Sequence, residues 1–223
     1  MAISRRQMLS RFAAGGVLSS LSPLAATVGE EGLGRYARYF AEAEPAPEAD
    51  PGLAPTEPNI LGPYFRSGAP WRGKVCPPCA AGEVLLIGGR VLSTDRTPLA
   101  AQIDIWHADH QGRYDNDDPQ HPPGETMLNR IRLLADEAGR YEYETVMPGA
   151  YALGPGTWRP RHIHYRVRAP GHRELITQLY FRGEAHNEGD PFIRPSLIID
   201  LVEARGAVGG YRQGRFDIVL APL

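Results

Sequence analysis

Residues 159–165 read "RPRHIHY" and place two histidines, His162 and His164, two positions apart in a strand-like run. Side chains at positions i and i+2 of a strand share a face. The two imidazoles are therefore either packed aromatic rings or neighbouring metal ligands. A cupin-type metal site is disfavoured because it would need a glutamate three or four residues after the second histidine, where Val167 and Arg168 stand.

The segment His107-Ala108-Asp109 supplies the H-x-D half, two of the three ligands, of an iron(II) facial triad. His162 or His164 would then be the distant third ligand. This alternative predicts an oxygenase of the iron(II)/2-oxoglutarate type.

Two tyrosines offer a different ligand set. Tyr114 in "DIWHADHQGRY" and Tyr151 in "VMPGAY" each follow a glycine-containing turn at the end of an expected strand. A free tyrosine has a pKa of about 10, but a highly charged metal can hold the phenolate at neutral pH. Two phenolates and two neutral imidazoles would form a hard, doubly anionic site suited to a trivalent cation, best iron(III).

The elements that must position these side chains are short and separated by turns rich in glycine, proline and aspartate. Several alternate apolar and polar residues, as strands with one buried face do. Strands are expected at 84–92, 100–108, 128–136, 140–147, 162–169, 174–181, 197–204 and 215–221. This run of strands without intervening helices indicates an all-β fold, an antiparallel β-sandwich. The longer connections 109–127 and 182–196 are expected to carry function.

The composition is that of a globular protein, with 223 residues, 42% hydrophobic and 22% charged residues, and a formal charge of −2. Acids and bases are interspersed, so there is no basic surface for nucleic acid. Beyond the N-terminal segment, no apolar run is long enough for a stable membrane span.

The N-terminal segment 1–26 has the pattern of an export signal, and Arg5-Arg6 within it resembles a twin-arginine motif. The twin-arginine export machinery is thus an expected partner, and the expected location is periplasmic or extracellular. Residues 27–55 are expected to form a short arm and linker whose aromatic residues could build a homo-oligomer. The sandwich domain is expected to span 56–223.

The two cysteines of the chain, Cys76 and Cys79, stand in "CPPC". In an oxidising compartment a local disulfide is the expected state. Free or metal-bound thiols are the alternatives. A zinc site would need two further ligands, and a redox-active pair would be expected to open a helix, which Pro77 and Pro78 disfavour.

Taken together, four stretches resemble, in order and spacing, the intradiol ring-cleavage dioxygenases, the family of catechol 1,2-dioxygenase and protocatechuate 3,4-dioxygenase. These stretches are "GRVLSTDRTPLAAQIDIWHADHQGRY", "MPGAY", "WRPRHIHYRV" and "LITQLYF". The resemblance covers about residues 56–221.

The resemblance implies one non-haem iron(III) per chain, held by Tyr114, Tyr151, His162 and His164 with a solvent-derived hydroxide. In that family a catechol binds the iron as a dianion, and one tyrosinate, by analogy Tyr151, leaves the metal and takes up a substrate proton. Dioxygen then cleaves the ring between the two hydroxyl-bearing carbons to give a cis,cis-muconate-type product.

Three further residues match family positions around the substrate. Arg159 and Gln178 would flank the ring and stabilise its negative charge. Tyr64 in "NILGPYF" would line the substrate mouth. Pro160 cannot donate to a β ladder, so the strand is expected to start after it, which frees Arg159 to reach the ring, while Arg161 faces away.

The export signal, the cysteine pair and the short arm depart from the cytosolic members of the family. The identity of the catechol-type substrate is therefore open. A secreted β-sandwich that binds an aromatic compound or a glycan without turnover is an alternative from another functional class.

Overall fold

The computed structural model describes residues 52–117, 127–206 and 209–223, all of which belong to one compact unit, Pro45–Leu223. The expected signal at 1–26 and nearly all of the expected arm at 27–55 lie outside the described residues. Within the described part, no helix is both long enough and apolar enough to cross a membrane.

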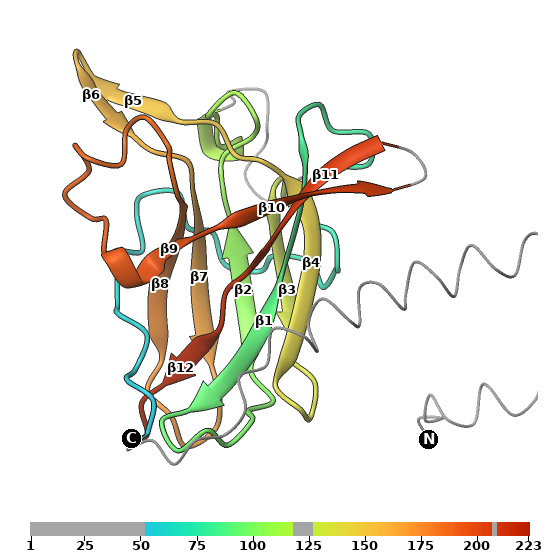
Figure 1. The fold of residues 1–223 in the computed structure, drawn as a ribbon, viewed down its shortest axis with the longest axis vertical. Coiled ribbons are helices and arrows are strands. Elements are labelled where there is room, and N and C mark those ends of the chain that lie inside the picture. The colour runs from blue at the N-terminus through green and yellow to red at the C-terminus, as the bar shows by residue number, and fades with distance from the viewer. Residues whose placement is uncertain (1–51, 118–126, 207–208) are drawn as a thin grey trace, which may run out of the picture. The chain divides into compact units, whose positions relative to one another are not determined.

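Two five-stranded sheets form a β-sandwich (Figure 1). The first sheet contains β10 (Leu201–Gly206), β11 (Gly209–Arg215), β1 (Val84–Ser93) and β12 (Ile218–Leu220), with β4 (Arg140–Val146) paired to β1. The second sheet contains, in order, β3 (Arg130–Leu134), β2 (Gln102–Trp106), β7 (His162–Arg168), β8 (Leu175–Phe181) and β9 (Ile198–Ile199). All eight expected strand regions contain strand, which confirms the all-β sandwich.

The alternation of residues along β7 explains how the sandwich positions the histidines. Ile163, Tyr165 and Val167 belong to the main core cluster and are fully buried. His162 and His164 alternate with them and therefore lie on the other face of the second sheet. Both histidines are also buried, because segments outside the sheet cover this face.

The pairing of the strands adds a detail to the expected antiparallel sandwich. Most pairs are antiparallel, but β1 pairs in parallel with both β11 and β12, and β9 pairs in parallel with β8. The expected strand 215–221 is divided between the end of β11 and β12. The division falls where Asp217 Oδ1 accepts a hydrogen bond from the backbone of Arg90 at 2.9 Å, in place of a ladder bond.

A third element, the hairpin of β5 (Tyr151–Gly154) and β6 (Thr157–Arg159), was not expected from the sequence. It projects from one end of the sandwich in Figure 1. Its strands are very short and its tip is Gly154-Pro155-Gly156, so alternation gives little signal there. Two 3₁₀ turns, η1 (Asp115–Asp117) and η2 (Pro195–Leu197), complete the described elements.

Candidate metal centre

The segments that carry the two tyrosines interlock through their backbones. The carbonyl oxygen of Asp109 accepts hydrogen bonds from Gly112 N at 3.0 Å and from Gly149 N at 2.8 Å. A Cβ atom on Gly149 would lie 2.3 Å from Gly112 N, and Gly112 has a φ of +83°. Only glycine allows this approach and this left-handed backbone. The contact thereby brings the turn before Tyr114 against the segment that enters β5 at Tyr151.

The residue after Tyr114 fixes its position. The Asp115 carboxylate accepts hydrogen bonds from Arg130 Nε at 2.7 Å, from Arg66 Nη1 at 3.1 Å and from Leu128 N at 3.2 Å. The side chains of Asp115 and Arg130 are 1% and 2% exposed. Because the charges neutralise each other inside the protein, this pair anchors the backbone on which the Tyr114 phenol stands.

The two histidines of β7 present their Nε2 atoms to each other. His162 Nδ1 lies 2.7 Å from Pro160 O, and since a carbonyl only accepts, Nδ1 carries the proton and Nε2 keeps its lone pair. His162 Nε2 lies 3.2 Å from His164 Nε2. Two imidazoles bound side by side at about 2.1 Å from one metal would place these nitrogens about 3.0 Å apart. The observed separation is suited to a shared cation.

His164 is held by its packing partners. The Trp106 ring stacks on it, with centroids 4.9 Å apart and planes 5° from parallel. A Cβ atom on Gly62, whose φ is +74°, would lie 3.1 Å from His164 Cε1. The glycine backbone thus approaches the imidazole where a side chain would crowd it.

The rings of the four expected ligands gather at one place. Tyr151 lies 5.7 Å, centroid to centroid, from both Tyr114 and His162, and Tyr114 lies 6.5 Å from His164. Tyr64 is half-buried and stacks on Tyr114 at 4.1 Å, so it borders the site as expected. The Tyr114 hydroxyl is buried without a hydrogen-bond partner of good geometry. Such an orphaned oxygen suits a cation ligand, because a buried polar group without a partner is costly.

Burial sets the protonation of this cluster. It lowers the pKa of His162 to about 3, with the Arg159 charge as a second cause, and lowers the pKa of His164 well below its usual value. Both imidazoles are therefore neutral and able to bind a metal. Burial also raises the pKa of Tyr114 and, despite the nearby Arg159 charge, that of Tyr151. A bound cation would oppose these tyrosine shifts by favouring the phenolates.

The donor set has two imidazole nitrogens and two phenol oxygens. Among residues 52–117, 127–206 and 209–223, no three histidine, cysteine or acidic side chains cluster in a way that could hold a metal. His162 and His164 can therefore form a four-ligand metal site only together with the phenol oxygens of Tyr114 and Tyr151. Two anionic oxygens and two neutral nitrogens favour a hard, highly charged cation such as iron(III).

The alternative iron(II) triad is wrong, because its members are already engaged. His107 Nδ1 lies 2.6 Å from Ala108 O, and its Nε2 lies 2.7 Å from Thr145 Oγ1. The Asp109 carboxylate accepts from Gln111 N at 2.8 Å and from Arg113 Nε at 3.2 Å, which stabilises the turn before Tyr114. His107 therefore has no ring nitrogen left for a metal, and within the described residues no group of three histidine, cysteine or acidic side chains could complete the triad.

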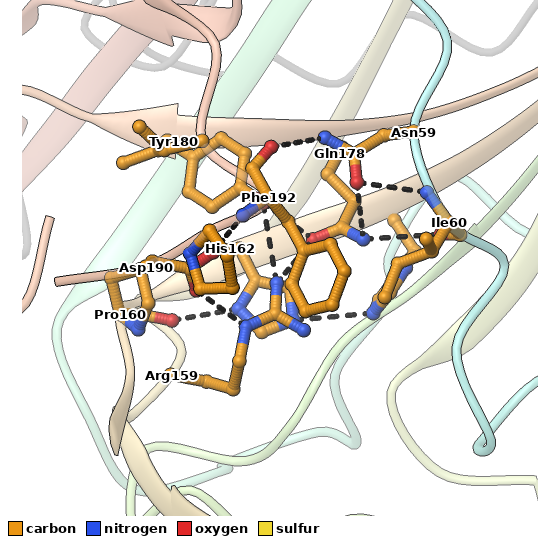
Figure 2. Close-up of polar contacts among 12 residues, drawn as sticks. Asn59, Ile60, Arg159, Pro160, His162, Gln178, Tyr180, Asp190 and Phe192 are labelled. Carbon is orange, nitrogen blue, oxygen red and sulfur yellow. Dashed lines mark hydrogen bonds and ion pairs between the residues drawn. The ribbon is translucent and has the colours of Figure 1, made fainter. Parts of the chain in front are cut away.

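Arg159 is the last residue of β6 in the hairpin, and Figure 2 shows its side chain beside His162. It pairs with Tyr151 across β5 and β6, is 3% exposed, and donates from Nη2 to Gln178 Oε1 at 2.7 Å. The main strand β7 begins at His162, after Pro160, as expected. Arg161 instead pairs with Glu184 at 3.4 Å, consistent with its expected outward orientation.

Gln178 lies opposite His164 on β8, but its amide is fully used by the protein. Its Oε1 accepts from Arg159 and from Tyr180 Oη at 2.8 Å. Its Nε2 donates to Asn59 Oδ1 at 3.2 Å and to Ile60 O at 3.1 Å (Figure 2). An amide offers two donor hydrogens and one acceptor oxygen with two lone pairs. In this arrangement Gln178 has no free donor for a substrate, and it orients Arg159 instead.

Comparison with known proteins agrees with this geometry. A family model described as dioxygenase matches residues 60–222. The chain belongs to this dioxygenase family. It is 35% identical over 185 residues to a 6-chlorohydroxyquinol 1,2-dioxygenase of Cupriavidus pinatubonensis, covering 75% of this chain and 65% of that relative. It is also 36% identical over 155 residues to a chlorocatechol 1,2-dioxygenase of Rhodococcus opacus, covering 60% of each protein.

Solved structures give the same result. The dioxygenase domain of a dioxygenase and carbohydrate-binding protein fusion from Streptomyces sp. SirexAA-E is 33% identical, with a TM-score of 0.65 over 76% of this chain and 100% of that one. The 3-chlorocatechol 1,2-dioxygenase of Rhodococcus opacus 1CP is 25% identical, with a TM-score of 0.71 over 89% and 86% of the two chains. The chain spans about two thirds or less of the length of the first two relatives above.

Sequence reasoning missed several residues that support the family site. Asp190, Tyr180, Asn59 and Trp106 all contact a site residue. Tyr180 follows Gln178 by two positions on a strand, so the sequence could have predicted that both side chains lie on the same face of the sheet. Asp190 lies in the connection 182–196, which was expected to be functional, but no motif indicated which of its acids points inward.

The cysteine pair corrects another expectation. Cys76 is buried, Cys79 is exposed, and both are free thiols, so the expected disulfide is not formed. Ala80 N donates to Pro77 O at 3.2 Å, which closes a turn in which Cys79 has a φ of 58°. This turn directs Cys79 to the surface and leaves Cys76 inside.

Proposed function

We propose that the protein is an iron(III)-dependent intradiol dioxygenase, which uses O₂ to cleave a catechol-type ring between its hydroxyl-bearing carbons. The observation that carries the proposal is the convergence of Tyr114, Tyr151, His162 and His164 in a family whose named relatives include catechol, chlorocatechol and hydroxyquinol 1,2-dioxygenases. The expected product is of the cis,cis-muconate type.

The four side chains would hold the iron, which when bound would supply a Lewis acid and a template for the catechol dianion. Tyr151 is the less buried of the two tyrosines and lies beside Arg159. Because burial raises the pKa of Tyr151, its Oη would retain a proton taken from a catechol hydroxyl. The Arg159 guanidinium would stabilise negative charge on the substrate.

The proposal is tested with Tyr114→Phe, with Tyr64→Phe as the matched control. Both changes remove one hydroxyl from a stacked pair of rings. The wild-type protein loaded with iron should be red to purple from tyrosinate-to-iron charge transfer, Tyr114→Phe should lose most of this absorption, and Tyr64→Phe should keep it. A colourless protein with stoichiometric iron would refute the assignment.

Substrate class is tested with an oxygen electrode and a panel of catechol, protocatechuate, hydroxyquinol, and chlorinated or lignin-derived catechols. Ring cleavage predicts oxygen uptake with at least one of them. A sandwich that binds an aromatic compound or a glycan without turnover predicts none.

The proposed location is outside the cytoplasm, by twin-arginine export. Its support is the sequence pattern around Arg5 and Arg6. Replacement of both arginines by lysine should keep a tagged full chain in the cytoplasmic fraction.

A further inference from the structure

The guanidinium of Arg159 is held on one side only. An arginine has five N–H donors in a fixed fork. Arg159 Nε donates to Asp190 Oδ2 at 2.5 Å, and Nη2 donates to Gln178 Oε1 at 2.7 Å and to Tyr180 Oη at 3.2 Å. These bonds use three of the five donors. Within the described part of the chain, no hydrogen bond from Nη1 is formed.

Asp190 is itself held firmly in place. Its side chain is fully buried, and its Oδ1 accepts from Phe192 N at 2.7 Å. The Phe192 ring lies against the Arg159 guanidinium, 4.8 Å from its centroid to Cζ. The connection 182–196 therefore contacts Arg159 through both a carboxylate and an aromatic face, and it fixes the plane of the guanidinium.

We propose that Asp190 is a positioning residue, which holds Arg159 so that the two Nη1 hydrogens point at the ring of a catechol bound beside Tyr151. The inference rests on the proposed function. It assigns a role in the reaction to a loop that supplies none of the four expected ligands.

The geometry explains why the carboxylate is needed in addition to Gln178 and Tyr180. Gln178 and Tyr180 are neutral and both contact Nη2, at one end of the guanidinium. Asp190 contacts the guanidinium at a second point, Nε, and is a negatively charged partner for the buried Arg159. A misplacement of a charge-stabilising group by about 1 Å can cost about 100-fold in rate.

The test compares Asp190→Asn with Asp200→Asn in the iron-loaded full chain. Asp200 also accepts from an arginine Nε, that of Arg182 at 2.5 Å, but its side chain is 70% exposed. Asp190→Asn should lower kcat for the best catechol by about 10- to 100-fold and change KM by less than about threefold. Asp200→Asn should change neither. Iron content and the visible absorption of Asp190→Asn should stay as in the wild type, since no ligand is altered.

A double-mutant cycle separates positioning from general destabilisation. In an Arg159→Lys background, which has no guanidinium fork to orient, Asp190→Asn should lower kcat by less than about twofold further. An equal fold loss in both backgrounds overturns the inference. If Asp190→Asn does not fold, Asp190→Glu takes its place in the cycle, and full wild-type activity of that variant also overturns it.

The outcomes for the two proposals differ. Full activity of Asp190→Asn beside an active wild type overturns only the role of Asp190. Absence of oxygen uptake by the iron-loaded wild type with every catechol overturns the proposed function and this inference with it.

Discussion

Gly149→Ala is the change that most directly tests how the tyrosine segments are brought together. The added Cβ would lie 2.3 Å from Gly112 N, 2.7 Å from Gln111 C and 2.8 Å from His110 O. All three are backbone atoms, so no side-chain rotation relieves the overlap. Since carbon contacts are normally about 3.5–4.0 Å, the turn at 109–113 must move away by about 1 Å.

The magnitude follows from two contributions. Overpacking of this kind costs about 1–3 kcal/mol. Loss of the hydrogen bond from Gly149 N to Asp109 O, which is 2.8 Å long, adds about 1 kcal/mol. The free energy of unfolding should therefore fall by about 2–4 kcal/mol, which a domain with a typical stability of about 5–15 kcal/mol survives. The displaced turn separates Tyr114 from Tyr151, so iron affinity should fall as well.

The assay is urea unfolding together with iron titration, and Gly154→Ala is the matched control. Gly154 lies on the same segment, has no positive φ, and an added Cβ would meet nothing within 4 Å. Gly154→Ala should keep the unfolding midpoint and iron affinity of the wild type. Equal stability and equal iron affinity of the two variants would refute the interlocking of the turns as the basis of the site.

Two further predictions concern buried groups near the site. Burial lowers the pKa of His107 to about 4 in the folded protein, whereas an unfolded histidine has a pKa of about 6.5. Between pH 6.5 and 4, His107 is therefore protonated in the unfolded chain but neutral in the folded one, and about 3 kcal/mol of folding stability is lost over this range. Urea unfolding of His107→Gln should show a smaller loss between pH 7 and 4.5 than the wild type, and an equal loss would contradict this. Asp115→Ala leaves the Arg130 charge buried and should cost about 3–5 kcal/mol, whereas the exposed control Asp200→Ala should cost less than about 1 kcal/mol.

The strands were largely predictable because alternation reports one buried face. On β7 the apolar residues Ile163, Tyr165 and Val167 enter the core, and this alone places His162 and His164 together on the other face. The hairpin β5–β6 was not predictable in this way, and neither was the parallel pairing of β1 with β11 and with β12. Strands of three or four residues are too short to show a clear alternation of apolar and polar residues. Whether two strands pair in parallel or antiparallel depends on the path of the chain between them.

The candidate site likewise has parts that the sequence could predict and parts that it could not. Tyr114 and Tyr151 were recognisable because their turns and spacing match a known pattern, but the backbone contact of Gly112 with Gly149 joins segments 37 residues apart and has no local signature. The role of Asp190 depends on the path of the connection 182–196, which nothing in its composition defines.

By itself, the sequence determined the kinds of atoms available for chemistry and the faces on which they lie, since residue type and strand alternation are local properties. Only the tertiary structure decided which of these groups are free to act. His107 and Gln178 have the right chemistry, yet each has its hydrogen-bonding atoms occupied by the protein. Tyr114 Oη and Arg159 Nη1 are not so occupied within the described residues, and hydrogen-bond saturation of this kind is set by neighbours far away in the chain.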